Sequence, residues 1–510
     1  MSDKTQTSEQ SITSRLLLRV ERAGNRLPHP TLLFMWLALG VIALSWLLSS
    51  IGIEVLHPLT QQPQAVNNLA NGAGLRRILS EAVSNFTRFA PVGVVLVTML
   101  GIGIAEHAGL LACLLRKVVA KARPASLAYV VAFAGVISSL GADVGYVVLI
   151  PLAALLYHAN NRPPLAGIAV AFAGVSAGFS ANLLLGPVDV MLAGISTEAA
   201  RLVQPDAMVA ASDNYYFIIV STFLITLLAG AIGNRIVEPR LQAGDAGKYE
   251  LAPTVSNEAD NHGIADTQND NQSLALVGWF SLFYGLLLVA LAWPGVGALS
   301  AQGGERNPLL SNVVPLLALY FGLAGYLFGR SNGVYRNASQ ALVGMENAMS
   351  TMAYYLVLMF FAAQFVNYFA WSNIGSILAI AGASALSDLQ GYPVLLMLAV
   401  ILLSALINLF VGSASAKWAL LAPILVPMLL LLDVPPEQTQ MAYRIGDSTT
   451  NIITPLMPYF GIVLAYAQRY RQNLGLGHII AMMLPFSVAL LLGWSILIVI
   501  WVSLSLPFGP

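Results

Sequence analysis

Five charged side chains lie inside stretches of sequence that are otherwise apolar: Asp143, Asp189, Lys417, Arg444 and Asp447. A charge at the centre of a membrane helix costs roughly 2.5–3.5 kcal/mol on insertion scales, so each of these residues needs a partner or a function. Arg444 and Asp447 are three residues apart and would share one face of a helix. A direct ion pair between them is therefore one interpretation.

The other interpretation of Asp447 is an ion or substrate site. Hydroxyl and amide oxygens beside a carboxylate suit a small hard cation or the polar groups of a substrate. Asn408 is a lone amide in a separate apolar segment, and together with Asp447 it is our candidate ligand set for Na⁺. Asn182 and Asn451 are further candidates for ion coupling. The oxygens that follow Asp447 directly belong to Ser448, Thr449, Thr450 and Asn451.

Asp189 is the first candidate for a proton carrier. Its own apolar segment contains no basic residue, and it follows a helix-breaking Gly186-Pro187 pair. We therefore expect its partner to lie across the helix bundle or to be a proton that it loads and releases. The alternative is an aspartate that caps a helix at an exposed mouth, and Asp143 could likewise cap the tip of a hairpin.

The sequence GSASAKW, which begins at Gly412, carries another group of candidates. We expect this segment to expose Ser413, Ser415, Lys417 and Trp418. Trp418 could stack on an aromatic ligand or pack in the interior, and Lys417 or Arg444 could bind a ligand carboxylate.

One catalytic pattern is present, because Gly174, Ser176 and Gly178 spell GxSxG. The pattern lies in an apolar helical run with no preceding strand and no evident His and Asp partners. Its glycines also form a GxxxG motif, so helix packing is the favoured interpretation and an intramembrane hydrolase the disfavoured one.

Composition limits the class of protein. The chain has 510 residues, of which 57% are apolar and 9% are Asp, Glu, Lys or Arg, whereas soluble domains carry roughly 25% charged residues. The 24 basic and 24 acidic residues cancel, so no nucleic-acid partner is expected. A single cysteine, Cys113, and six histidines without a zinc pattern predict no disulfide framework and no cofactor. The coupling ion would be H⁺ or Na⁺.

The apolar segments predict an all-α polytopic membrane protein in contact with lipid. A crossing needs roughly 20 apolar residues, and a basic cytoplasmic tail, residues 1–30, places the N-terminus inside by the positive-inside rule. Nine crossings are expected, at Thr31–Ile53, Phe89–Ala105, Pro163–Leu185, Tyr215–Gly233, Ser273–Trp293, Val313–Gly329, Thr351–Ala370, Met441–Tyr466 and Ile479–Leu504.

Two further apolar stretches, 126–158 and 393–432, are broken in the middle by small and polar residues, and we interpret both as re-entrant helical hairpins. Each arm of the first is about 12 residues, or about 18 Å, which is too short to cross. A polar cytoplasmic linker, 240–272, divides the chain into membrane halves at 31–239 and 273–510.

The halves resemble each other in order. The first hairpin contains GADVGYVVLIPL and the second GSASAKWALLAPI, and the interrupted crossings that follow contain SANLLLGPVD and DSTTNIITP. Five crossings separate the hairpins, so the second half would be inverted relative to the first. Backbone groups freed at such breaks must be buried or line a wet cavity, which predicts a binding site where the breaks meet.

These motifs, with ERAGNRLPHP at Glu21, NFTRFAPVG at Asn85 and YRIGDSTTNIITPLMPYFG at Tyr443, make the chain similar to the p-aminobenzoyl-glutamate transporter family. The resemblance implies a bacterial inner-membrane homodimer with nine spans and two hairpins per protomer. It also implies ion-coupled transport of p-aminobenzoate-derived aromatic compounds: uptake of p-aminobenzoyl-glutamate, or export of sulfonamide antimetabolites.

The resemblance assigns functional positions one by one. Its hairpin serine and tryptophan match Ser415 and Trp418, and its span aspartate matches Asp189. Its arginine, aspartate and flanking prolines match Arg444, Asp447, Pro436 and Pro455. Lys417 departs from the family pattern, which has an uncharged residue there, so the preferred substrate charge stays open. The expected function is secondary transport by alternating access; the alternatives are a passive channel and a transporter for an unrelated small organic anion.

Overall fold

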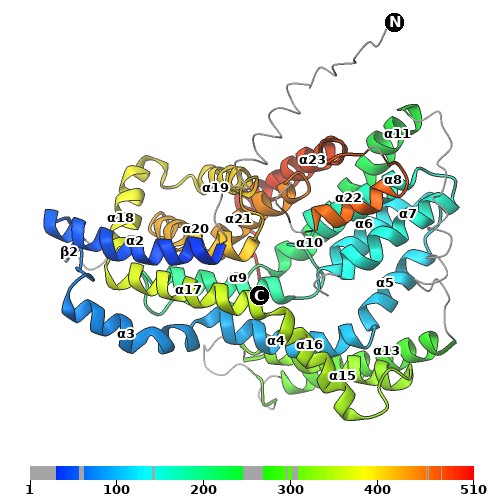
Figure 1. Cartoon of the computed structure of the whole chain (residues 1–510), viewed down its shortest axis with the longest axis horizontal. Coiled ribbons are helices and arrows are strands. Elements are labelled where there is room, and N and C mark those ends of the chain that lie inside the picture. Colours follow the sequence, from blue (N-terminus) through cyan, green and yellow to red (C-terminus); the bar gives the residue numbers. More distant parts are fainter. Residues whose placement is uncertain are drawn as a thin grey trace, which may run out of the picture.

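The computed structural model describes residues 30–56, 63–140, 144–244, 268–293, 297–300, 308–454, 457, 459–472 and 474–510. It is nearly all helical, with 76% of the chain in helices (Figure 1). Residues 1–29 of the predicted tail, residues 245–267 of the predicted linker, Asp143 and Pro455 lie outside the described residues.

An inner group of helices contains the segments predicted as hairpins and interrupted crossings. In the first half these are α6 (Leu127–Ser138), the π-helical turn η1 (Gly145–Leu149), α7 (Ile150–Ala159), α8 (Pro164–Phe172), the π-helical turn η2 (Ala173–Ala177) and α9 (Pro187–Ala200). In the second half they are α19 (Pro393–Asn408), α20 (Ala414–Leu430), α21 (Pro436–Asn451) and α22 (Phe460–Gln468). Two long helices pack beside them, α10 (Tyr215–Ile232), continued by η3 (Gly233–Val237) and α11 (Glu238–Gly244), and α23 (Leu476–Ser503).

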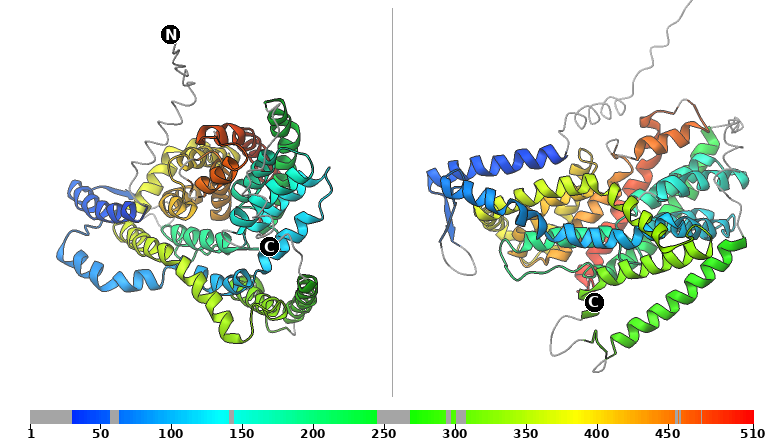
Figure 2. Two further views of the ribbon diagram at one scale, coloured as in Figure 1. Left: turned by 45° about the vertical axis from the view of Figure 1, so that its right-hand side comes forward. Right: turned by 60° about the horizontal axis from the view of Figure 1, so that its bottom comes forward.

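The remaining helices form an outer group around this core. In the turned views of Figure 2, α3, α13 and α15 stay at the periphery of the molecule. A separate hydrophobic cluster joins α4, α5, α13 and α15. The outer elements are α2 (Pro30–Ile51), α3 (Gly72–Thr87), α4 (Ala90–His107), α5 (Leu110–Ala120), α13 (Gln268–Leu291), α14 (Pro308–Ser311), α15 (Val313–Ser331), α16 (Ala338–Thr351), α17 (Ala353–Trp371), α18 (Ile374–Ala385) and the 3₁₀ turn η4 (Ser387–Leu389).

The only strands among the described residues form a small hairpin after α2. β1 (Glu54–Leu56) pairs antiparallel with β2 (Pro63–Ala65), with Val55 opposite Gln64.

Seven helical segments in the described part of the chain are long and apolar enough to cross a membrane. Seven of the nine predicted crossings fall on them, and the other two are the interrupted ones. Large apolar side chains point outward from these segments; Trp279 of α13, for example, is 72% exposed. The seven are Thr31–Ile51, Gly72–His107, Tyr215–Gln242, Asn269–Leu291, Val313–Ser331, Ala353–Trp371 and Leu476–Ser503.

The predicted breaks occur close to where the sequence indicated. The helical segment formed by α8 and η2 ends at Ala177, and α9 begins at Pro187. A proline is tolerated in the first turn of a helix, because an amide hydrogen there would have no partner within the helix. α21 ends at Asn451. In the second hairpin, helical structure stops after Asn408 and resumes at Ala414.

Four helices of more than ten residues were not among the predicted elements. They are α3, α5, α16 and α18, of 16, 11, 14 and 12 residues. α3 carries Arg76, Arg77 and Glu81, so no window of uncharged residues identifies it. The other three are too short or too polar for the crossing criterion.

Close packing of α21 on α19 depends on Gly446. A Cβ atom at this position would lie 2.2 Å from the carbonyl oxygen of Ile401 and 2.8 Å from the amide nitrogen of Ala405. Both of those atoms belong to the backbone of α19 and cannot move alone. The absence of a side chain at Gly446 therefore sets the distance between the two helices.

We predict that Gly446→Ala lowers the melting temperature of the purified protein, because separating α19 from α21 costs about 1–3 kcal/mol of overpacking strain. Scanning fluorimetry in detergent measures the effect. Gly278→Ala in α13 is the matched control, since a Cβ there meets nothing within 4 Å. Equal melting temperatures for the two variants would show that this helix contact tolerates a methyl group.

Candidate functional site

Two buried ion pairs link the inner helices. Nη2 of Arg444 lies 2.6 Å from Oδ1 of Asp189, and the ammonium of Lys417 contacts Oδ1 of Asp447. All four side chains are at most 5% exposed. The first pair joins α21 to α9 and hence the second half of the chain to the first, whereas the second pair joins α20 to α21.

Asp189 occupies the first turn of α9 and does two things. Its Oδ2 accepts a hydrogen bond of 2.7 Å from the amide of Gly186, which caps the new helix, and its Oδ1 faces Arg444. The same Nη2 of Arg444 donates to the carbonyl of Ser180, at 2.9 Å, in the unwound segment. Asp189 is thus a cap, as one alternative proposed, but it is buried rather than exposed at a mouth, and its partner lies across the bundle.

The predicted pair between Arg444 and Asp447 is wrong. Although Arg444 and Asp447 are three positions apart on α21, each pairs with a charge from another helix. An intrahelical pair would leave Asp189 and Lys417 buried without opposite charges, and breaking a buried pair costs about 3–5 kcal/mol. The two cross-helix pairs neutralise all four groups.

Asn408, the last residue of α19, connects the predicted ion-coupling residues. Its Nδ2 donates to the carbonyl of Asp447 at 2.6 Å, to Oγ1 of Thr450 at 2.8 Å and to Oδ1 of Asn451 at 3.0 Å. Its Oδ1 accepts from the ammonium of Lys417. The end of α19 is therefore fixed to the end of α21 by one amide.

Asn182 lies elsewhere, in the unwound segment before α9. Its Nδ2 donates to Oγ of Ser139 at 2.9 Å, and its Oδ1 accepts from the amides of Leu183 and Leu184. These contacts attach the unwound segment to the C-terminal end of α6. The structure does not bring Asn182 into contact with the cluster of Asn408.

The prediction that the GSASAKW segment exposes its side chains is half wrong. Ser413 and Ser415 are half-buried, but Lys417 and Trp418 are fully enclosed. Trp418 stacks on Tyr443 of α21, with centroids 4.5 Å apart, and its Nε1 donates to Oγ of Ser196 at 3.0 Å. Pro436 is at the first turn of α21, away from these contacts.

The tips of the two hairpins contact opposite halves. Trp418 of the second hairpin reaches α9 of the first half, whereas Tyr146 of the first hairpin stacks on Tyr459, next to α22 of the second half. The centroids of the two tyrosines are 4.2 Å apart. Each of the two segments predicted as hairpins therefore contacts an interrupted helix of the other half.

Sequence reasoning missed a polar chain that continues from Trp418. Nε2 of Gln440 donates to Oγ of Ser196 at 3.1 Å, and Nδ2 of Asn214 donates to Oε1 of Gln440 at 2.7 Å. All three side chains are buried. Their only signal in the sequence is a polar residue in an apolar environment, which is too common for uncharged residues to identify a site.

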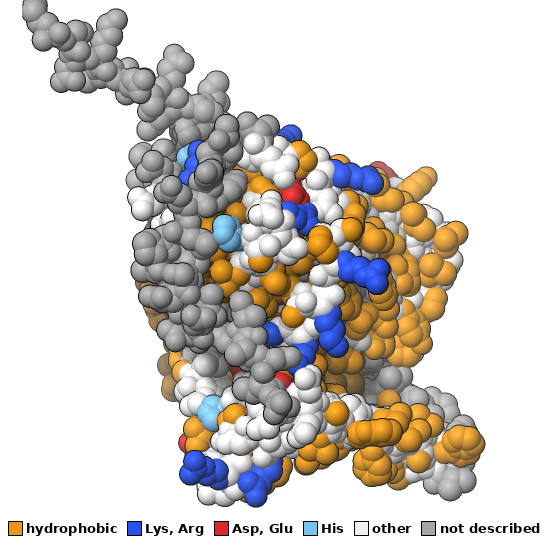
Figure 3. All heavy atoms as spheres, turned by 90° about the vertical axis from the view of Figure 1, so that its right-hand side faces the viewer, with side chains coloured by type: hydrophobic (Ala, Val, Ile, Leu, Met, Phe, Trp, Pro, Cys, Tyr) orange, Lys and Arg blue, Asp and Glu red, His pale blue; other side chains and the backbone are white. Residues whose placement is uncertain are grey.

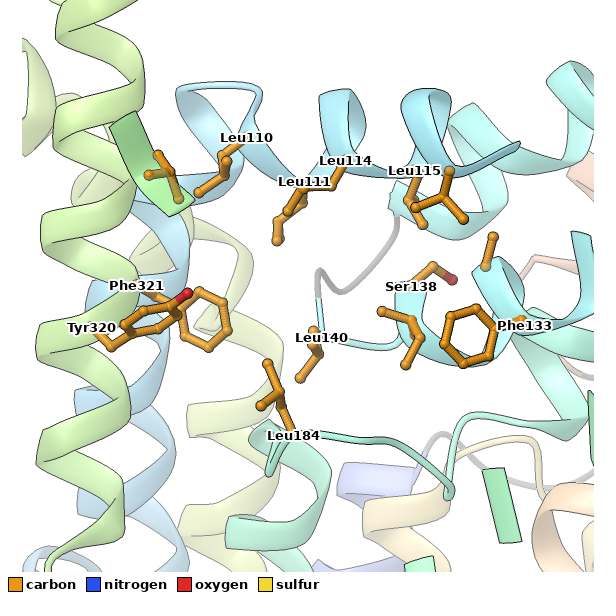
Figure 4. A pocket seen from close by; sticks show the side chains of 14 residues that line it. Leu110, Leu111, Leu114, Leu115, Phe133, Ser138, Leu140, Leu184, Tyr320 and Phe321 are labelled. Atoms are coloured by element: carbon orange, nitrogen blue, oxygen red, sulfur yellow. The ribbon is translucent and has the colours of Figure 1, made fainter. Parts of the chain in front are cut away.

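Two cavities lie outside the charged cluster. An apolar one of about 160 Å³ lies between α5, α6 and α15, where Leu110, Leu140 and Leu184 converge (Figure 4). A polar one of about 200 Å³ is lined by residues of α3 and α17 and by Glu198 of α9. None of the candidate site residues that the structure describes lines either cavity. Among the described residues there is also no group of three His, Cys, Asp or Glu side chains that could hold a metal ion.

Comparison with known proteins gives a consistent result. The sequence model of the AbgT putative transporter family matches residues 15–510. The p-aminobenzoyl-glutamate transport protein of Escherichia coli (strain K12) is 34% identical over 496 residues, which cover 96% of this chain and 95% of that protein.

Two crystallised or otherwise solved proteins share the fold. The Alcanivorax borkumensis YdaH transporter has 47% sequence identity and a TM-score of 0.88, covering 95% of this chain and all (100%) of that one. Neisseria gonorrhoeae MtrF, described with a class of antimetabolite efflux pumps, has 40% identity and a TM-score of 0.90, covering 96% and 97%.

We predict that Asp447→Asn destabilises the protein by about 3–5 kcal/mol, because it leaves the ammonium of Lys417 buried without a counter-charge. The double variant Lys417→Met with Asp447→Asn should recover most of this loss. Chemical denaturation of the purified protein measures both, with Asp388→Asn on the exposed surface as the control. A double variant no more stable than Asp447→Asn would contradict the pairing.

Proposed function

The chain belongs to the AbgT transporter family, and from that premise we propose that it is an ion-coupled secondary transporter of p-aminobenzoate-derived aromatic compounds that works by alternating access. The family and its relatives are transporters, so this multi-pass membrane protein is a transporter and not an enzyme. In agreement with that, the hydroxyl of Ser176 is buried and directed at Sδ of Met457, 3.3 Å away.

The chemistry of the buried site supports an aromatic acid as substrate. A guanidinium is planar and binds a carboxylate through two parallel hydrogen bonds, and Arg444 already holds one carboxylate. Tyr443, which stacks on Trp418, directly precedes Arg444 in α21. One relative is named for p-aminobenzoyl-glutamate transport and another is described with antimetabolite efflux pumps. For this chain we propose uptake of p-aminobenzoyl-glutamate or export of sulfonamide antimetabolites.

The pair of Arg444 and Asp189 carries the proposal. This ion pair joins the first turn of α9, in the first half of the chain, to α21 in the second half. It therefore holds the two halves together. A substrate carboxylate can take the place of Asp189 on Arg444 if Asp189 gives up its charge. A proton bound to Asp189 does this, so proton loading and substrate binding become linked at one guanidinium.

The hairpins provide the moving parts in this proposal. In this proposal helices α6 and α7, and α19 and α20, enter the membrane and return, and each tip makes a side-chain contact with the opposite half. Releasing one tip at a time would open the site to one side and then to the other. A second ion, Na⁺ at Asn408 and Asp447, is the other coupling option.

Orientation follows from the basic residues. Figure 3 shows Lys and Arg side chains grouped on the face to which the ends of α5, α7 and α11 contribute. By the positive-inside rule this end is cytoplasmic, in a bacterial inner membrane, with the N-terminus on the same side. We also propose that the protein is a homodimer with one pathway per protomer. The exposed basic residues include Lys121, Arg123, Arg235 and Arg240.

We predict that vesicles containing the protein accumulate labelled p-aminobenzoyl-glutamate or a sulfonamide under an imposed proton gradient. Asp189→Asn, which cannot exchange a proton, should abolish gradient-driven accumulation while downhill exchange of substrate persists. Asp433→Asn, on the exposed surface, is the control. Accumulation by Asp189→Asn equal to wild type under every gradient would refute the proton-carrier role, and flux insensitive to any gradient would indicate a passive channel.

A further inference from the structure

The predicted sodium ligands already hold a cation. The ammonium of Lys417 contacts Oδ1 of Asn408 and Oδ1 of Asp447, and these are the two residues that the sequence suggested for Na⁺. The side chains of Lys417 and Asp447 are each 1% exposed, and Asn408 is fully buried. An ammonium and a sodium ion carry the same charge and both seek oxygen atoms, so they compete for one position.

The position of Lys417 is costly for the helix that carries it. Lys417 lies in the first turn of α20, whose N-terminus is capped by Ser413. The helix dipole places positive potential there, which disfavours a lysine by roughly 0.3–1 kcal/mol. The C-terminal end of α19, at Asn408, and the carboxylate of Asp447 compensate for it. Lys417 is therefore placed for its contacts and not for helix stability.

The surroundings offer oxygen atoms beyond those that the ammonium uses. Besides Lys417, the hydroxyl of Tyr443 is a hydrogen-bond partner of the Asp447 carboxylate. The hydroxyl of the adjacent Ser448 has no hydrogen-bond partner among the described residues. Asp447 and Ser448 are at most 1% exposed. A buried hydroxyl without a partner, next to a buried carboxylate, provides oxygen atoms that a monovalent cation can use as ligands.

We propose that the ammonium of Lys417 is a built-in cation that occupies the sodium position between Asn408 and Asp447, so that this chain does not bind Na⁺ there. An uncharged residue in place of Lys417 opens the position to free Na⁺. This inference deepens the proposed function, on which it rests for its meaning: with the position filled from within, a sodium gradient does not drive transport, and the proton at Asp189 is the remaining coupling ion.

The test is binding of radioactive sodium (²²Na⁺) to the purified full-length protein, with choline chloride keeping ionic strength constant. Wild type should show no sodium binding that depends on Asp447, so wild type and Asp447→Asn should bind equally little sodium. Lys417→Met, which keeps the length of the side chain, should bind sodium at least about tenfold more tightly than wild type. Lys417→Met with Asp447→Asn should lose that gain, and Lys121→Met on the exposed surface should behave as wild type.

A second measurement covers variants that fold poorly. Lys417→Met and Lys417→Gln leave Asp447 buried without its counter-charge, so NaCl should raise their melting temperatures relative to choline chloride, whereas wild type should not respond. The proposal is overturned if wild type binds sodium through Asp447, or if a folded Lys417 variant gains none. If neither Lys417 variant can be purified, the wild-type measurement still tests the proposal, because sodium binding that Asp447→Asn removes would overturn it and its absence would agree with it.

The outcome is independent of the substrate. Sodium binding is measured without any transported compound, so a failure to transport p-aminobenzoate derivatives would refute the proposed function and leave this inference standing. Conversely, sodium-driven accumulation by wild type in vesicles would refute the inference and leave the proposed substrate class intact.

Discussion

The structure depends on how four buried charges are neutralised within a bundle that is otherwise apolar. Asp189 and Asp447 each contact a basic side chain on another helix. None of the four paired side chains is more than 5% exposed. A buried pair is weak evidence for stability, since apolar residues of similar volume often serve as well. Each charge costs free energy inside a membrane, and for this reason we propose that both pairs are retained for function.

The broken helices are what allow these pairs to form. If α8 continued through residues 178–186, Asp189 would lie on a continuous rod and Ser180 would not offer its carbonyl to Arg444. The missing side chain of Gly446 brings α21 against α19, which places Asn408 within hydrogen-bond distance of the end of α21. Each hairpin tip is then held by the opposite half, through Trp418 on one side and Tyr146 on the other. Breaking one of these contacts would consequently change the packing of both halves.

Sequence reasoning found the elements of this arrangement better than it found their contacts. Apolar length located seven helices able to cross, and Pro187 and Asn451 marked the breaks. Membrane cost identified the charged residues, because that argument needs no partner. The partners could not be predicted: spacing on α21 favoured Arg444 with Asp447, whereas the observed pairs depend on how helices far apart in sequence are packed. Trp418 was expected to be exposed for the same reason, since a hairpin tip is covered only once the other half is present.

The most direct test is a structure of the protein with a p-aminobenzoate-derived substrate bound, determined by electron cryomicroscopy. We predict that the guanidinium of Arg444 then contacts the carboxylate of the ligand and that Oδ1 of Asp189, now 2.6 Å away, has moved beyond hydrogen-bond distance. A bound ligand elsewhere in the protein, with the pair between Arg444 and Asp189 unchanged, would contradict the account.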